Sequence, residues 1–258
     1  MKKKKNVAEP LPSNPGPQLI VDEAPFEYVE AHKAFRTNFN FVTANSKSRK
    51  IVVTSTLRDE GKSSLSANLA ISLAQAGSKV LLIDADLRNP SLHRYLHMAT
   101  DTKKGTSNLL SGDVKVGECL IKTEYGVDVI AGGPIPQNPV ELIASDAMRD
   151  LLNIAAQHYD YVICDAPPVG IITDAAALCT LCDGVLFVIR QNFANKARVR
   201  DAIKKLMTVN AKILGTVMTQ YMIPQNAAKR YGYGYRYRNE YKYGYGYGYY
   251  QHEDGEQS

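Results

Sequence analysis

The chain has 258 residues, enough for one large α/β domain, and its formal net charge is +5. We expect no secretory signal, since Met1 is followed by lysines, and no membrane span, since no apolar run reaches the required length. The four cysteines are few and scattered, which argues against a disulfide framework and for a reducing, cytoplasmic location. We interpret the lysines at 2–5 as a solvated run, so nucleic acid is not an expected partner.

Strands and helices are predicted to alternate along most of the chain. Residues 1–27 form a flexible lead-in, because positions 6–25 are rich in Pro, Asn and Gly. A helix follows at 28–42, where apolar residues recur at helical spacing. Strands are then expected at 50–54, 79–83, 127–131, 161–164, 184–189 and 213–219, and helices at 62–76, 140–158 (interrupted near Ser145), 174–182 and 196–208. This alternation predicts an α/β fold with a mainly parallel sheet flanked by helices.

The first predicted strand leads into the sequence STLRDEGKSS at 55–64 and then into a helix. A tight turn followed by Gly-Lys-Ser at a helix start is typical of the phosphate-binding loop (P-loop) of NTPases. In such a loop the lysine binds β- and γ-phosphate oxygens and the serine hydroxyl ligates Mg²⁺. Thr56 stands where the general pattern has its first glycine. The predicted nucleotide-binding residues are Arg58, Asp59, Glu60, Gly61, Lys62, Ser63 and Ser64.

Carboxylates follow two of the predicted aliphatic strands. Asp84 and Asp86 come directly after the strand at 79–83, and Asp165 follows the strand at 161–164. Carboxylates at the ends of buried strands are poor structural choices unless a cation lies nearby. The carboxyl ends of parallel strands are also where such sheets bind ligands. Together with Lys62 and Ser63, these three aspartates predict a Mg-nucleotide site.

The sequence between 231 and 250 reads YGYGYRYRNEYKYGYGYGYY and holds ten of the sixteen tyrosines. It contains no aliphatic side chain with which to build a core, so residues 223–258 are predicted to be a flexible tail. Taken alone, the tail fits an adhesive segment as well as a set of phosphoryl acceptors. The candidate acceptors are Tyr231, Tyr233, Tyr235, Tyr237, Tyr241, Tyr243, Tyr245, Tyr247, Tyr249 and Tyr250.

The loop at 55–64, the sequence DADLRNP at 84–90, the sequence ICDAPP at 163–168 and the tyrosine-rich tail occur in that order. In this the chain resembles the bacterial tyrosine kinases (BY-kinases), in particular the separate cytoplasmic kinases of Gram-positive capsule and exopolysaccharide systems. The resemblance covers residues 28–250, and the family's phosphate loop also tends to lack the first glycine. The family's E-x-x-R-x-x-R helix, which drives ring assembly, corresponds here to Glu30, Lys33 and Arg36. Lysine in place of the middle arginine is a departure from that pattern.

The resemblance implies a protein-tyrosine kinase domain at 28–222, with a P-loop NTPase fold, that uses ATP and Mg²⁺. It implies phosphorylation of the tail in trans within a homo-oligomeric ring, and control of capsular or exopolysaccharide synthesis and export. The implied partners are a membrane-embedded polysaccharide co-polymerase, which recruits the kinase to the inner face of the membrane, and a cognate tyrosine phosphatase. Lys62, Asp84 and Asp86 would be catalytic, and Ser63, Asp84 and Asp165 would hold the metal. We expect Asp86 to accept the phenol proton, although the roles of Asp84 and Asp86 could be exchanged.

Two other functions fit parts of the sequence. Partition and division-site ATPases share the expected fold, but they carry an extra lysine where this chain has Leu57, and they lack a tyrosine tail. A scaffold with an adhesive tail, whose nucleotide only regulates assembly, would cluster without forming phosphotyrosine. Relatives often have Asn after the last strand, where this chain has Thr219 and Gln220, so adenine contacts are not assigned.

Overall fold

The computed structural model describes residues 19–21, 24–44, 49–98 and 103–221. The chain divides into two units, residues 1–219 and residues 220–258, and of the second only Gln220 and Tyr221 are described. All ten candidate acceptor tyrosines lie outside the described residues, as does most of the predicted lead-in. The fold and the candidate site both belong to the first unit.

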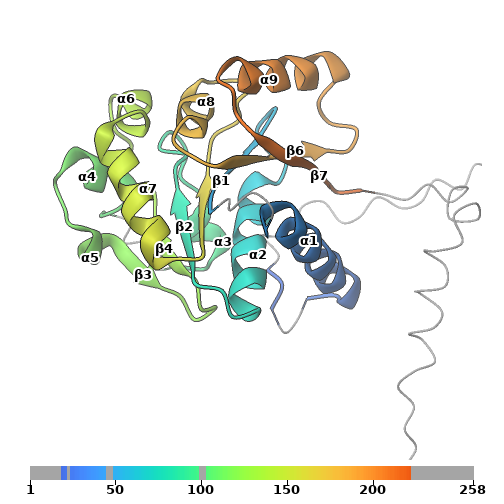
Figure 1. Cartoon of the computed structure of the whole chain (residues 1–258), viewed down its shortest axis with the longest axis horizontal. Helices are drawn as coiled ribbons and strands as arrows, with labels where there is room; N and C mark the ends of the chain where they lie inside the picture. The colour runs from blue at the N-terminus through green and yellow to red at the C-terminus, as the bar shows by residue number, and fades with distance from the viewer. Residues whose placement is uncertain (1–18, 22–23, 45–48, 99–102, 222–258) are drawn as a thin grey trace, which may run out of the picture. The chain divides into compact units, whose positions relative to one another are not determined.

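A seven-stranded sheet with the order β3-β4-β2-β5-β1-β6-β7 forms the centre of this unit (Figure 1). The strands are β1 (Lys50–Ser55), β2 (Val80–Asp84), β3 (Leu120–Lys122), β4 (Asp128–Ile130), β5 (Tyr161–Asp165), β6 (Gly184–Arg190) and β7 (Ile213–Thr219). All neighbouring pairs are parallel except β3 and β4, which are antiparallel. The prediction of a mainly parallel sheet is confirmed.

Helices cover both faces of the sheet (Figure 1). They are α1 (Phe26–Ala44), α2 (Lys62–Gln75), α3 (Leu92–Tyr95), α4 (Thr106–Ser111), α5 (Val116–Cys119), α6 (Pro139–Ile143), α7 (Asp146–His158), α8 (Asp174–Cys179) and α9 (Lys196–Thr208). Successive residues of β1 enter different cores, because side chains alternate across a strand. Val52 packs with α7, α8 and α9, whereas Ile51 and Val53 pack with α1 and α2.

The predicted boundaries differ from the structure where local capping decides them. The helix expected at 140–158 is divided into α6 and α7 at Ser145, whose hydroxyl donates to Leu142 O (2.7 Å) and accepts from Met148 N (3.2 Å). The helix expected at 174–182 ends at Cys179. Four further elements, α3, α4, α5 and β3, were not predicted, because with three to six residues each they are too short to show a periodicity.

Part of the predicted flexible lead-in belongs to the core. Leu19 and Ile20 are each only 4% exposed and pack with residues of α2. The backbone N–H of Ile20 donates to Asn68 Oδ1 at 2.8 Å. Asn68 Nδ2 in turn donates to the hydroxyl of Tyr28 on α1 at 3.0 Å and to Ser64 O at 2.9 Å. One asparagine of α2 therefore joins the lead-in, α1 and the start of α2.

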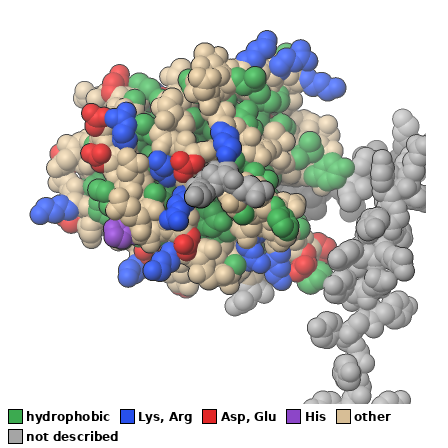
Figure 2. Space-filling model, in the orientation of Figure 1, with side chains coloured by type: hydrophobic (Ala, Val, Ile, Leu, Met, Phe, Trp, Pro, Cys, Tyr) green, Lys and Arg blue, Asp and Glu red, His purple; other side chains and the backbone are tan. Residues whose placement is uncertain are grey.

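Basic and acidic side chains are interspersed on the face of the molecule drawn in Figure 2. Among the described residues, no helix has both the length and the apolar character needed to cross a bilayer.

Candidate active site

The P-loop connects β1 to α2 and lies at the carboxyl end of β1. Gly61 has φ +88°, a left-handed conformation that favours glycine, directly before the helix begins at Lys62. Glu60 is fully buried, and its Oε2 atom accepts from Leu57 N at 2.7 Å. Thr219, at the end of β7, donates from its hydroxyl to Glu60 O at 2.7 Å. The Glu60 carboxylate is thus hydrogen-bonded inside the loop. The part of Glu60 that could contact a phosphate is therefore its backbone.

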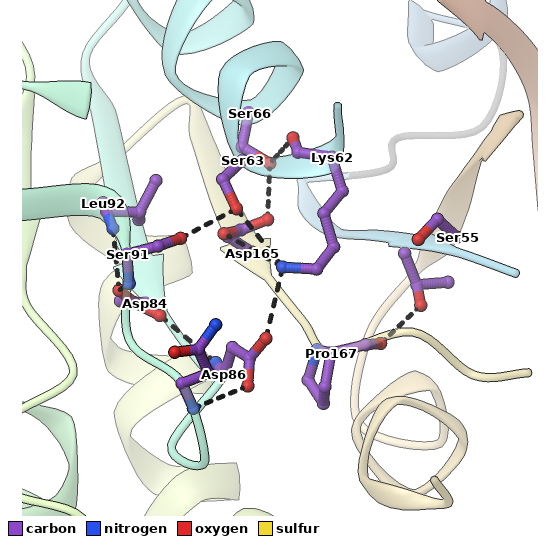
Figure 3. A network of polar contacts seen from close by, with 12 residues as sticks. Ser55, Lys62, Ser63, Ser66, Asp84, Asp86, Ser91, Leu92, Asp165 and Pro167 are labelled. Carbon is purple, nitrogen blue, oxygen red and sulfur yellow. Dashed lines mark hydrogen bonds and ion pairs between the residues drawn. The ribbon is translucent and has the colours of Figure 1, made fainter. Parts of the chain in front are cut away.

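The structure brings the predicted charged residues together beneath this loop. Lys62 Nζ lies 3.2 Å from Asp86 Oδ2 and 3.9 Å from Asp165 Oδ2, and it donates to Ser63 Oγ at 3.2 Å. Figure 3 shows the side chains of Lys62, Asp86 and Asp165 pointing toward one another. Lys62 and Ser63 begin α2, and Asp165 ends β5, which is hydrogen-bonded to β1. Asp86 lies in the loop that follows β2. Arg58 and Asp59 are exposed at the apex of the loop, and Ser64 is half-buried.

Asp84 and Asp86 have different surroundings. Asp84 is fully buried, and its Oδ2 atom accepts from the N–H groups of Ser91 (2.9 Å) and Leu92 (3.0 Å). Its other oxygen accepts from Asp86 N at 3.2 Å, so both oxygens are held by backbone. Asp86 instead directs one oxygen to Lys62 and accepts from Asn89 N with the other at 3.1 Å. Asp84 therefore fixes the loop that carries Asp86.

Burial and mutual repulsion perturb these groups. Burial, together with the charge of Asp165, raises the pKa of Asp84 to about 7. Burial also raises the pKa of Asp165, although Lys62 opposes the shift. For Lys62, burial lowers the pKa, but the carboxylates of Asp165, Asp86 and Asp84 outweigh it and raise the pKa above its ordinary value. The lysine is therefore a charged ammonium that compensates several buried carboxylates.

The residues around Ser63 fit a magnesium ion that a nucleotide also ligates. Asp165 Oδ2 is buried and accepts no hydrogen bond within the described part of the chain, which leaves a carboxylate oxygen available. Its other oxygen accepts from Ser66 Oγ at 3.2 Å. Ser63 Oγ accepts from Ser91 Oγ at 3.0 Å and from Lys62 Nζ at 3.2 Å, so a metal ion bound there would take the place of one of these donors. The described residues include no cluster of three or more His, Cys, Asp or Glu side chains suited to a metal, so phosphate oxygens would have to complete the coordination.

One contact of this site had no signal in the sequence, whereas a second could have been anticipated from it. Arg88 forms a bidentate pair with Asp174 at the start of α8, with Nε–Oδ2 at 2.8 Å and a second bond of 3.1 Å. Asp174 is 1% exposed and lies far along the chain from the loop at 84–90. Ser91 follows the sequence DADLRNP directly, so its proximity to Ser63 could have been anticipated from position alone.

The three residues expected to drive assembly lie on α1, outside this cluster. Lys33 Nζ pairs with Glu30 Oε1 at 2.8 Å, and both side chains are exposed, at 52% and 43%. Arg36 is used within the chain, where it donates to Ser72 O of α2 at 2.7 Å. The structure therefore places only Glu30 and Lys33 largely in solvent.

A P-loop at the end of β1 and carboxylates at the ends of β2 and β5 define a P-loop NTPase-type nucleotide-binding fold. In agreement, residues 48–217 match the model of the AAA domain family. The chain is 32% identical to the putative tyrosine-protein kinase CapB of Staphylococcus aureus, over 90% of this chain and 98% of that protein. It is 37% identical to the tyrosine-protein kinase YwqD of Bacillus subtilis, over 78% of this chain and 85% of that protein.

Solved structures agree with these relatives. The crystal structure of the chimerical protein CapA2B2 has a TM-score of 0.70 and 35% identity, over 76% of this chain and 85% of that one. The kinase domain of the Escherichia coli tyrosine kinase ETK has a TM-score of 0.70 and 32% identity, over 76% of this chain and 78% of that one. The chain therefore belongs to the bacterial tyrosine kinases of the capsular and exopolysaccharide type.

Proposed function

We propose that this kinase transfers the γ-phosphoryl group of ATP to tyrosines of its own tail, using Lys62, Asp86 and Asp165. The observation that carries the proposal is the convergence of Lys62 with Asp86 and Asp165 below the P-loop. P-loop proteins use such an ammonium to bind β- and γ-phosphate oxygens. Ser63 and Asp165, directly or through water, would hold Mg²⁺, and the bound ion would neutralise phosphate charge.

In the proposed reaction a tyrosine oxygen bonds to the γ-phosphorus while the bond from that phosphorus to the β–γ bridging oxygen breaks. ADP leaves with the electron pair of the broken bond, and the phenol proton passes to Asp86. A phenol has an ordinary pKa of about 10, so a nearby base is needed at neutral pH. The surroundings of the two aspartates support Asp86 in this role, because backbone N–H groups hold both oxygens of Asp84. Asp84 would then orient Asp86 and the water around the metal.

The tail supplies the proposed acceptors. Residues 222–250 would extend at most roughly 100 Å at about 3.3–3.6 Å per residue, which is long enough to reach a neighbouring subunit. We propose phosphorylation in trans within a ring assembled partly through Glu30, Lys33 and Arg36. Each phosphate adds about −1.5 to −2 charges, so several of them would make neighbouring tails repel and the ring dissociate. A tyrosine phosphatase would reverse this change.

A membrane partner completes the proposal. The matched solved structure is that of a chimerical protein, CapA2B2, and one relative of this chain is named CapB. We propose that a membrane-embedded polysaccharide co-polymerase contributes a cytoplasmic segment that recruits this chain to the inner face of the membrane and activates it. The cycle of phosphorylation and dephosphorylation would then regulate synthesis and export of capsular or exopolysaccharide.

The test mixes two variants that are each unable to form tail phosphotyrosine alone. One is full-length Asp165→Asn, in which an isosteric amide replaces the carboxylate. The other ends at residue 222, keeps the active site and lacks the tail. With MgATP, phosphotyrosine on the Asp165→Asn chain is expected only in the mixture. Its absence there, while the wild-type chain is modified, would contradict transfer in trans. Tail-dependent clustering of the wild-type chain without phosphotyrosine would instead support a scaffold.

A further inference from the structure

A close backbone contact joins the P-loop to the turn after Asp165. A Cβ atom added to Gly170 would lie 2.1 Å from Thr56 O, 3.0 Å from its carbonyl carbon and 3.2 Å from its Cα. Thr56 is buried, at 1% exposure, and occupies the first-glycine position of the general P-loop pattern. The absence of a side chain at Gly170 is therefore what allows the Thr56 carbonyl to occupy its position.

The turn that carries Gly170 is held on two sides. The hydroxyl of Thr54, on β1, donates to Pro167 O at 2.7 Å and accepts from Val169 N at 3.2 Å (Figure 3 shows Pro167). From α9, Lys205 Nζ donates to Gly170 O at 3.0 Å and to Val169 O at 3.3 Å. A methyl group at position 170 could not be accommodated by movement of this turn without breaking these bonds. The P-loop would have to move instead.

A shift at Thr56 would reach the phosphate-binding part of the loop. Ser55 Oγ donates to Leu57 O at 2.6 Å, and Leu57 N donates to Glu60 Oε2 at 2.7 Å. Glu60 directly precedes Gly61 and Lys62, where the backbone turns into α2. These bonds leave few residues between Thr56 and the predicted phosphate contacts that could absorb a displacement.

We propose that Gly170 is a positioning residue for the P-loop, with Lys205 of α9 fixing the turn that presents it. In the general P-loop pattern, the first glycine lets the backbone pack closely at that position of the loop. In this chain Thr56 stands there, and the close packing is allowed by the missing side chain of Gly170, on the segment after Asp165. The turn does not touch the nucleotide and acts through Thr56. The inference rests on the proposed binding of MgATP by the loop.

The experiment measures the dissociation constant for MgADP and the melting temperature of the full-length protein. We expect Gly170→Ala to weaken MgADP binding about tenfold, which is roughly the loss of one phosphate hydrogen bond. Gly184→Ala is the matched control for destabilisation, because its Cβ would lie 2.6 Å from the Leu214 side chain. Gly184 is the first residue of β6, at the end of the sheet away from the P-loop. It should lower the melting temperature without changing the affinity. Gly117→Ala, with nothing within 4 Å of the added Cβ, should change neither.

A second-site variant tests whether the contact with Thr56 carries the effect. Thr56→Gly combined with Gly170→Ala moves the glycine to the other side of the contact, where its wider range of backbone angles lets the carbonyl turn away. Affinity for MgADP should return to within about threefold of wild type. No recovery by a folded double variant would contradict the proposal, as would wild-type affinity in Gly170→Ala.

Lys205→Met tests the same turn without adding any atom to it. We expect MgADP affinity to fall about threefold, the cost of weakening a surface hydrogen bond, whereas Lys204→Met, with the same loss of charge, should bind as wild type. Equal affinities of these two variants would contradict the role of Lys205, including in the case where Gly170→Ala fails to fold. If the wild-type protein itself does not bind MgADP, the proposed function fails instead.

Discussion

Asp86 Oδ2 lies 3.2 Å from the ammonium of Lys62, so the proposed base and the proposed phosphate-binding cation form an ion pair. Both side chains are almost fully buried, at 6% and 11% exposure, which makes their interaction strong. A nucleotide that binds Lys62 through its phosphates would compete with Asp86 for the same ammonium. Nucleotide binding would therefore release the carboxylate that is proposed to take the phenol proton.

This competition leads to the first prediction. Asp86→Asn should lower kcat for tail phosphorylation by about 10²–10⁴-fold, because the amide cannot accept the proton. Affinity for MgADP should be unchanged or higher, since a carboxylate near the phosphates is lost and Lys62 is no longer shared. Steady-state kinetics and nucleotide titration measure the two quantities separately. A kcat within twofold of wild type would remove Asp86 from the proposed role.

The second prediction concerns pH. With a folded-state pKa of about 7, Asp84 keeps its proton in the folded protein at pH values where the unfolded chain has already lost it. Unfolding then releases a proton, so this contribution to stability is present below about pH 4 and is lost as the pH rises through about 7. In Asp84→Asn the fall in unfolding free energy between about pH 5 and pH 8 should be smaller by about 1–4 kcal/mol.

The measurement is denaturant unfolding without nucleotide and with a metal chelator. Asp84→Asn will also weaken the bonds to Ser91 N and Leu92 N and so lower stability at every pH. The slope against pH is therefore the quantity to compare. Parallel slopes for the two proteins would show that Asp84 is ionised throughout this range.

The structure separates the residues predicted to drive ring assembly. The exposed pair of Glu30 and Lys33 should contribute only about 0–1 kcal/mol to stability, so Lys33→Ala should reduce the oligomer mass without lowering the melting temperature. Arg36→Ala should lower both, because Arg36 also joins α1 to Ser72 O of α2. Light scattering and thermal unfolding distinguish these outcomes. An unchanged oligomer in Lys33→Ala would place the ring contact elsewhere.

The buried lead-in gives the fourth prediction. Ile20→Ala should destabilise the protein by about 2–4 kcal/mol, because the side chain is 4% exposed and packs with α2. Ile154→Ala, at a position 57% exposed, is the control and should cost less than about 0.5 kcal/mol. Chemical denaturation gives both values. Equal values would mean that Ile20 does not belong to the core.

The central strands and the charged cluster could be predicted from the sequence for a physical reason. Buried parallel strands are continuous aliphatic runs, and their carboxyl ends meet at one edge, so Lys62, Asp84 and Asp165 had to lie close together. Asp84 and Asp165 are in fact paired in register on β2 and β5. The contacts of Gly170 and Asp174 could not be predicted, because they depend on how loops distant in sequence pack. Leu19 and Ile20 were missed because two apolar residues beside a Pro- and Gly-rich segment show no period.

Because Asn68 binds both Ile20 and Ser64, the helix that starts the phosphate site is tethered to the lead-in. A fusion partner, an affinity tag or an immobilising surface attached ahead of Leu19 can pull on this segment. The Asn68 side chain would transmit that force to α2. The nucleotide affinity of protein attached through that end would then depend on the attachment as well as on the phosphate site.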